Sequence, residues 1–243
     1  MVLKSDETIT SADYHTGGEP FRIVDIGPME GTTVLDRRSW AEENLDDLRK
    51  FLINEPRGHA DMYGGFVVPA DDRNGDLGVV FFHKDGFSTA CGHGTIALVT
   101  WAIDTGLIEP KDEIVTVIVD VPSGRLVTEA KMHDQKVESV CFQNVPSFVS
   151  ATNISLQTSV GQVSVDISFG GAFYASVNAG ELELSPTASN IDALISLGRE
   201  IKNQLKDNQS AVHPDDDRLS GVYGTIFYEE IGTNPLHQRN MTV

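Results

Sequence analysis

Apolar residues recur at helical spacing in two segments of the chain. The first begins at Ser39, where Ser39 and Glu42 have the spacing of a capping box, and it ends before Pro56, because a residue that precedes proline disfavours the helical conformation. Its apolar face comprises Leu45, Leu48, Phe51 and Leu52. The second runs from Asn190 to about Lys206, with an apolar face of Ile191, Leu194, Ile195, Leu197, Ile201 and Leu205. Both patterns predict amphipathic helices that lie on a surface.

Most of the remaining apolar positions fall in short runs that are separated by Gly-, Asp- or Pro-containing turns, which is typical of strands in an antiparallel or mixed sheet. The predicted strands are Phe21–Ile26, Phe66–Pro69, Leu77–His83, Ile114–Val121, Leu126–Ala130, Val137–Phe142, Val160–Ser168, Ala172–Val177 and Val222–Tyr228. The turn over residues 121–124 suggests a division into two halves, 1–125 and 126–243. Strands combined with few helices predict a mixed α/β class.

A third helical segment differs from the other two. Thr95–Ile103 is apolar on all sides and carries no charge before Asp104, and Gly106 follows as a stop signal. A helix of this composition is buried on every face. We therefore expect a buried helix that begins near Gly92-His93-Gly94.

The start of a buried helix offers candidate chemistry. Its first backbone N–H groups lack partners within the helix, and a substrate carboxylate could accept their hydrogen bonds beside Gly92 and Gly94, which have no side chains to obstruct it. Cys91 precedes these glycines, and the helix dipole should lower the pKa of its thiol. A thiolate this close to a bound carboxylate is suited to moving the Cα proton of an amino acid.

On spacing alone, Cys91 is equally well interpreted as a structural residue. A free cysteine in an apolar stretch is usually an inert core residue, and a Gly-x-Gly sequence is weak support for a site. Cys141 lies between Val140 and Phe142 in a strand pattern, so we interpret it as a core residue. The turn at Gly17-Gly18 is likewise interpreted as structural.

Composition and net charge limit the kinds of partner and cofactor that the chain is expected to bind. The chain has 243 residues, of which 40% are hydrophobic, and a net charge of −18, which argues against nucleic acids and anionic membranes. No apolar run is long enough to span a bilayer and no secretory signal is evident, so we expect a cytoplasmic protein with free thiols. The histidines lack zinc-site spacing and no phosphate-binding glycine motif follows a strand, so we expect neither a metal nor a nucleotide cofactor.

Five motifs in a fixed order resemble one known family over essentially the whole chain. They are His15–Pro20 (HTGGEP), Glu55–Met62 (EPRGHADM), Ser88–Leu98 (STACGHGTIAL), Phe169–Ala175 (FGGAFYA), and His213-Pro214 followed by Gly221–Gly224 (GVYG). The chain therefore resembles the proline racemase family, which includes hydroxyproline 2-epimerases and trans-3-hydroxy-L-proline dehydratases.

The resemblance implies a cofactor-free enzyme with a diaminopimelate-epimerase-like fold, in which two pseudo-symmetric halves each wrap mixed strands around a central helix. It implies that Cys91 abstracts the Cα proton and that backbone groups of Gly92 and His93, beside Gly94, hold the carboxylate of a proline or hydroxyproline substrate. Tyr63 would form an aromatic wall of the pocket. A homodimer is compatible with this family.

The sequence also departs from the family pattern. Family members carry a second motif, similar to Asp-Arg-Ser-Pro-Cys-Gly-Thr-Gly, that opens a second central helix; its cysteine marks racemases and epimerases, and a threonine there marks dehydratases. Here Arg239–Val243 resembles the strand that leads into that motif. We therefore expect an incomplete second half, with apolar strand faces around Val163, Ile167 and Phe173 left uncovered.

Four hypotheses follow. The Ser88–Leu98 motif resembles the dehydratase branch of the family more than the racemase branch, which implies a lyase that dehydrates trans-3-hydroxy-L-proline. The alternatives are a proline racemase or 4-hydroxyproline 2-epimerase, and an inactive truncated remnant. A thiol hydrolase that uses Cys91 and His93 is the weakest, because side chains two residues apart at a helix start should diverge.

Overall fold

A computed structural model describes residues 8–243, which fold as two compact units that meet in sequence at Val145 and Pro146. This division comes later than the predicted one between residues 125 and 126. The turn over residues 121–124 is a hairpin inside the first unit, where Val121 pairs with Gly124. The strands after this turn hydrogen-bond to the first sheet, and this pairing keeps them in the first unit.

The first unit contains a mixed sheet in the order β1-β2-β3-β4-β6-β7-β8, with β5 paired to β4. Its strands are β1 (Ser11–Thr16), β2 (Glu19–Val24), β3 (Tyr63–Val68), β4 (Leu77–His83), β5 (Gly86–Phe87), β6 (Ile114–Val121), β7 (Gly124–His133) and β8 (Lys136–Gln143). The β2–β3 and β4–β6 pairs are parallel and the others are antiparallel.

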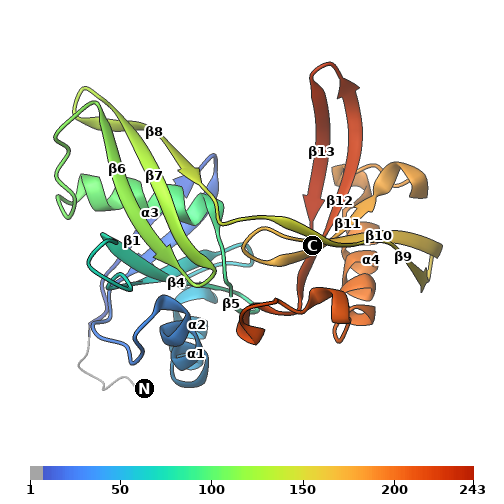
Figure 1. The fold of residues 1–243 in the computed structure, drawn as a ribbon, viewed down its shortest axis with the longest axis horizontal. Helices are drawn as coiled ribbons and strands as arrows, with labels where there is room; N and C mark the ends of the chain where they lie inside the picture. The colour runs from blue at the N-terminus through green and yellow to red at the C-terminus, as the bar shows by residue number, and fades with distance from the viewer. Residues whose placement is uncertain (1–7) are drawn as a thin grey trace. The chain divides into compact units, whose positions relative to one another are not determined.

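Helix α3 (Gly92–Asp104) packs against β1, β2, β3, β7 and β8 of this sheet. Figure 1 shows α3 lying within the first unit, between the β6–β8 strands and the strands around β1 and β4. Leu98, Val99 and Ala102 are completely buried, and Gly106 follows the helix with φ +74. The prediction of a buried helix closed by a glycine is confirmed.

Helices α1 (Val34–Asn44) and α2 (Asp46–Ile53) pack on another hydrophobic core of the first unit. The predicted single helix from Ser39 is wrong at its start, because Thr33 and Asp36 form the capping box. The Ser39 hydroxyl instead donates to the Leu35 carbonyl inside the helix. A break at the buried Leu45, which caps both helices, directs the apolar face of α2 into the core.

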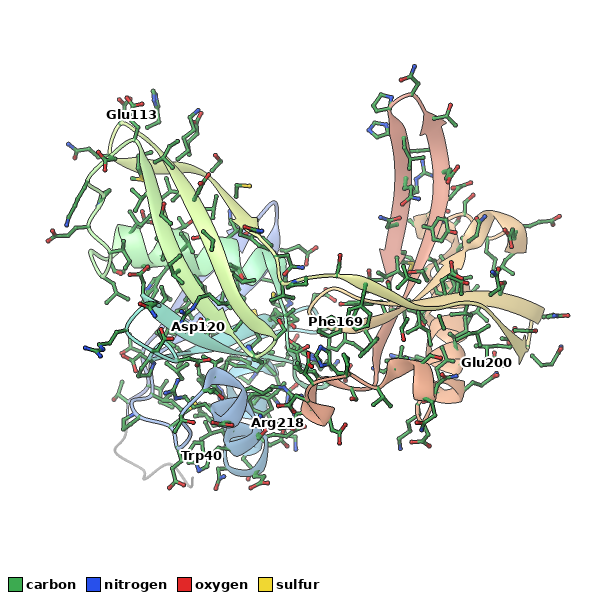
Figure 2. The ribbon with its side chains drawn as sticks, viewed as in Figure 1. Trp40, Glu113, Asp120, Phe169, Glu200 and Arg218 are labelled. Atoms are coloured by element: carbon green, nitrogen blue, oxygen red, sulfur yellow. The ribbon has the colours of Figure 1, made fainter. Side chains whose placement is uncertain are left out.

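The second unit contains a mixed sheet in the order β13-β12-β11-β10-β9. Its strands are β9 (Phe148–Thr158), β10 (Gly161–Phe169), β11 (Phe173–Asn178), β12 (Val222–Thr233) and β13 (Leu236–Thr242), and its helices are α4 (Ile191–Gln204) and the short 3-10 turns η1 (Ala179–Leu182), η2 (Ala188–Asn190), η3 (Gln209–Ala211) and η4 (Asp217–Leu219). Figure 2 shows Phe169 at the end of β10 and Glu200 on α4. Two mixed sheets with few helices confirm the predicted α/β class.

The expectation that strand faces around Val163, Ile167 and Phe173 lie uncovered is wrong, because these side chains are almost fully buried. Alternate residues of β10 and β11 point to the face on which α4 contributes Leu194, Leu197 and Ile201. The predicted amphipathic helix therefore covers part of this face, and the rings of Phe169 and His213 pack on Phe173.

Across residues 8–243, no helix combines the length and the apolar character needed to cross a membrane.

Candidate active site

Cys91 is the N-cap residue of α3. Its backbone is extended (φ −157, ψ 104), which turns the chain into the helix and directs the thiol back over the first turn. The Gly94 N–H donates to Sγ at 3.3 Å, and the Thr95 N–H and hydroxyl donate to the Cys91 carbonyl at 3.0 and 2.9 Å. The sulfur thus takes the place that a serine or threonine oxygen takes in an ordinary N-cap.

Two backbone donors remain at this helix start. Among residues 8–243, no hydrogen bond uses the N–H of Gly92 or His93, whereas those of Gly94 and Thr95 are engaged by Cys91. Gly92 is exposed, so an anion can approach the pair directly. Adjacent N–H groups at the positive end of a helix are a suitable site for a carboxylate.

Gly94 lies where no side chain fits. A Cβ atom there would come within 2.4 Å of Phe21 Cε2 and 2.8 Å of Cys91 Sγ. At Gly92 the corresponding atom would be 3.4 Å from Phe142 Cζ, an ordinary contact. The first glycine therefore leaves the backbone accessible, and the second makes room for the sulfur against the Phe21 ring.

The Cys91 thiol is buried, with 9% of the residue exposed. Burial raises its pKa to about 12; the Gly94 N–H acts in the opposite direction, and the negative charge of Glu19 adds to the increase. The expectation that the helix start lowers this pKa is wrong, because the loss of solvation outweighs the single backbone donor. The thiol is therefore protonated at neutral pH in this environment.

His93 lies closer to the thiol than the sequence suggested. Its ring nitrogens Nδ1 and Nε2 are 3.6 and 3.7 Å from Sγ, so the two side chains converge. Because the distances are nearly equal, the sulfur is aligned with neither nitrogen in particular. Burial lowers the pKa of His93, while Glu19 and the Pro20 carbonyl act in the opposite direction. The structure therefore contradicts the expected divergence of these two side chains, and the His93 ring packs on the thiol as one wall of the site.

Tyr63 belongs to an aromatic group around His93. Its ring centroid is 5.3 Å from that of His93, with an edge-to-face angle of 78°. Phe21 contacts the same histidine edge-on at 6.1 Å, and the His83 ring stacks on that of Tyr63 at 5.3 Å. The structure thus brings Tyr63, His93 and Cys91 together.

The turn between β1 and β2 also reaches this helix start. Gly17 and Gly18 have φ values of +60 and +100, which supports the structural interpretation of this turn. Next to it, the Thr16 hydroxyl donates to the His93 carbonyl at 2.9 Å. Sequence reasoning missed that Thr16 and Glu19 border the site; the available signal was their place in the HTGGEP motif.

The second cysteine lies elsewhere. Cys141 is exposed on β8, contrary to the prediction of a core residue, because the neighbouring Phe142 faces α3 and the alternation of the strand turns Cys141 outward. Both cysteines are free thiols, as predicted. Within residues 8–243, His, Cys, Asp and Glu side chains form no group of three or more that could hold a metal ion.

Comparison with known proteins identifies the family. The family model described as "Proline racemase" matches residues 11–243. The trans-3-hydroxy-L-proline dehydratase of Bacillus thuringiensis is 40% identical over 243 residues, which cover 99% of this chain and 73% of that protein. The dehydratase of Colwellia psychrerythraea is 39% identical over 97% of this chain and 67% of its own length.

Solved structures agree with these sequences. A hydroxyproline epimerase from Agrobacterium vitis, with bound trans-4-hydroxy-L-proline, superposes with a TM-score of 0.91 at 27% identity and covers 99% of this chain and 71% of its own. A probable proline racemase from Agrobacterium radiobacter, with bound carbonate, has a TM-score of 0.89 at 28% identity and covers 97% and 70%. The chain belongs to the proline racemase family, as its motifs predicted, and this confirms the expected enzyme class of lyase or isomerase.

Proposed function

We propose that this protein abstracts the Cα proton of a proline-type amino acid with Cys91 as the reacting group, and that its reaction is the dehydration of trans-3-hydroxy-L-proline. The observation that carries the proposal is the N-cap position of Cys91 on a buried helix, beside the two N–H donors of Gly92 and His93 that are without partners among residues 8–243. The activities named for the dehydratase relatives support the same choice.

The geometry suggests how the substrate would be held. A carboxylate on the N–H groups of Gly92 and His93 places the adjoining Cα close to Sγ, since both contacts belong to one helix turn. Gly94 keeps the sulfur in this position. The rings of His93 and Tyr63 form an apolar wall suited to the five-membered ring.

Proton abstraction requires a thiolate, whereas burial raises the pKa of Cys91 to about 12. The substrate supplies a positive charge near the sulfur, because its protonated ring nitrogen is bonded directly to Cα. A positive charge beside the sulfur favours the ionised form and lowers the thiol pKa in the complex. Glu19, whose negative charge is felt at both Cys91 and His93, would favour the same cation.

In the dehydration, Sγ takes the Cα proton and the C–H electron pair becomes the double bond between Cα and Cβ. The bond from Cβ to the 3-hydroxyl breaks, and the departing hydroxide takes up a proton and leaves as water. No net oxidation or reduction occurs. The same first step followed by return of a proton to the opposite face would invert Cα, and the epimerase with a TM-score of 0.91 supports this isomerase alternative.

Proton NMR in D₂O distinguishes the two reactions. The protein is incubated separately with trans-3-hydroxy-L-proline, trans-4-hydroxy-L-proline and L-proline. We expect loss of both the Cα and Cβ proton signals of the 3-hydroxy compound as the elimination product forms. Exchange at Cα of the other two with the appearance of the epimer would instead identify an isomerase. An unchanged spectrum for all three, from a folded protein, would refute the proposed function.

A further inference from the structure

Tyr63 and Ser88 join their hydroxyl groups beside the site. The two oxygens share a hydrogen bond in which either atom can be the donor. Ser88 directly follows β5 and is only 2% exposed, and its N–H is fixed to the Phe81 carbonyl at 3.2 Å. A buried hydroxyl needs a partner, so this bond determines where the far end of the Tyr63 side chain lies.

The Tyr63 ring also contacts the rings of two histidines. It stacks on His83, its cross-strand partner in the β3–β4 pair, with an interplanar angle of 26°. It also meets His93 edge-to-face, and the His93 ring reaches the Cys91 sulfur at 3.6 Å. A continuous series of contacts therefore runs from Ser88 through Tyr63 and His93 to Cys91.

Ser88 is also close to the thiol along the chain. Residues 88–91 lead from β5 into α3, and the Ser88 hydroxyl lies 3.5 Å from the Ala90 carbonyl. One hydrogen bond between two side chains thus ties the segment that carries the thiol to β3, which carries the ring that packs on His93.

We propose that Ser88 is a positioning residue for the reaction at Cys91: its hydrogen bond to Tyr63 locks the Tyr63 ring against His93, and so holds the His93 ring against the sulfur. This inference rests on the proposed function for its catalytic consequence. Its physical consequence is independent of catalysis: the locked rings keep water away from Sγ, and loosening them lets water solvate a thiolate. A residue that supports only the fold would change stability without changing the thiol.

The test uses two variants that remove the same bond, Ser88→Ala and Tyr63→Phe, and their double variant. All are made in a Cys141→Ser background, because the exposed Cys141 thiol would otherwise react. The matched control is Tyr14→Phe, which deletes a tyrosine hydroxyl that donates to Asp104 at the other end of α3. Thermal denaturation establishes that each variant is folded, and Tyr63→Phe keeps the test available if Ser88→Ala fails to fold.

Two measurements are made on each protein, the rate of Cys91 alkylation by iodoacetamide at about pH 8 and the kcat and KM of Cα proton exchange. We expect each single variant to alkylate about tenfold faster and to lose about five- to tenfold in kcat with little change in KM, as for the loss of one hydrogen bond. The double variant should match the single ones, because all lack the same bond. Tyr14→Phe should match the parent.

Alkylation and kcat within about twofold of the parent in both single variants would overturn the inference, as would equal changes in Tyr14→Phe. If the parent catalyses no exchange, the proposed function fails. The alkylation rates then decide alone: faster alkylation in both variants supports the positioning role, and unchanged alkylation refutes it.

Discussion

Replacing Gly94 by alanine tests whether the space around the sulfur is as restricted as the structure indicates. An alanine Cβ would lie 2.4 Å from Phe21 Cε2 and 2.8 Å from Cys91 Sγ, where ordinary contacts begin at 3.4 Å. The Phe21 ring is completely buried, so it cannot move aside without disturbing the core. The sulfur or the start of α3 must therefore shift.

Two opposing effects determine the stability of this variant. Alanine is favoured over glycine inside a helix by about 1 kcal/mol, while overpacking a core costs about 1–3 kcal/mol. We expect a net destabilisation of about 1 kcal/mol. Activity should fall by about a hundredfold, since a displacement of about 1 Å at reacting atoms has effects of this size.

The assay combines thermal denaturation with Cα proton exchange followed by NMR, and Gly92→Ala is the matched variant on the same helix. Its Cβ would make an ordinary 3.4 Å contact with Phe142, so it should lose far less stability than Gly94→Ala. A Gly94→Ala protein that gains about 1 kcal/mol and exchanges as fast as the parent would refute the reasoning, because only helix propensity would then be acting.

Three further predictions concern stability. Because folding raises the Cys91 pKa from 9.0 to about 12, the folded state holds the thiol proton more tightly, so stability is full below about pH 9 and falls as pH rises toward 12 by up to about 1.4 kcal/mol per pH unit. In denaturant titrations at several pH values, the unfolding free energy of Cys91→Ala should not show this fall. An equal fall in the variant and the parent would contradict the assignment of the pH dependence to Cys91. Leu197→Ala should cost about 2–5 kcal/mol of unfolding free energy, since Leu197 lies on the buried face of α4 and is 1% exposed, and a loss below about 1 kcal/mol would show that α4 contributes little to the core of the second unit. Thr33→Ala should cost about 1 kcal/mol in the same measurement through loss of the α1 cap, and an unchanged midpoint would show that the capping box contributes little.

The sequence anticipated elements whose own side chains determine their environment. The uninterrupted apolar run from Thr95 to Ile103 could only be stable if buried, and α3 is buried. The strands β1 and β9 were not predicted, because they lie at sheet edges with polar, half-exposed side chains. Their pairing depends on backbone hydrogen bonds to β2 and β10, which leave no hydrophobic alternation in the sequence.

The candidate site, like the fold, could be predicted from the sequence only in part. The position of Cys91 before a buried helix, and the function of Gly92 as open backbone, could be inferred from spacing and composition. The raised pKa of Cys91 and the approach of His93 to the sulfur could not, since both arise from long-range packing. Ser88 and Tyr63 are 25 residues apart in sequence, and the pairing of β4 with both β3 and β5 brings their hydroxyls together.

Hydrogen–deuterium exchange at Cα of trans-3-hydroxy-L-proline, compared between the Cys141→Ser protein and the same protein carrying Cys91→Ala, tests the role of Cys91 most directly. With Cys91 present, the Cα signal should disappear as product forms, and with alanine there the spectrum should stay unchanged while thermal denaturation shows an intact fold. Equal rates of loss of the Cα signal in the two proteins would contradict the assignment of Cys91 as the group that takes the proton.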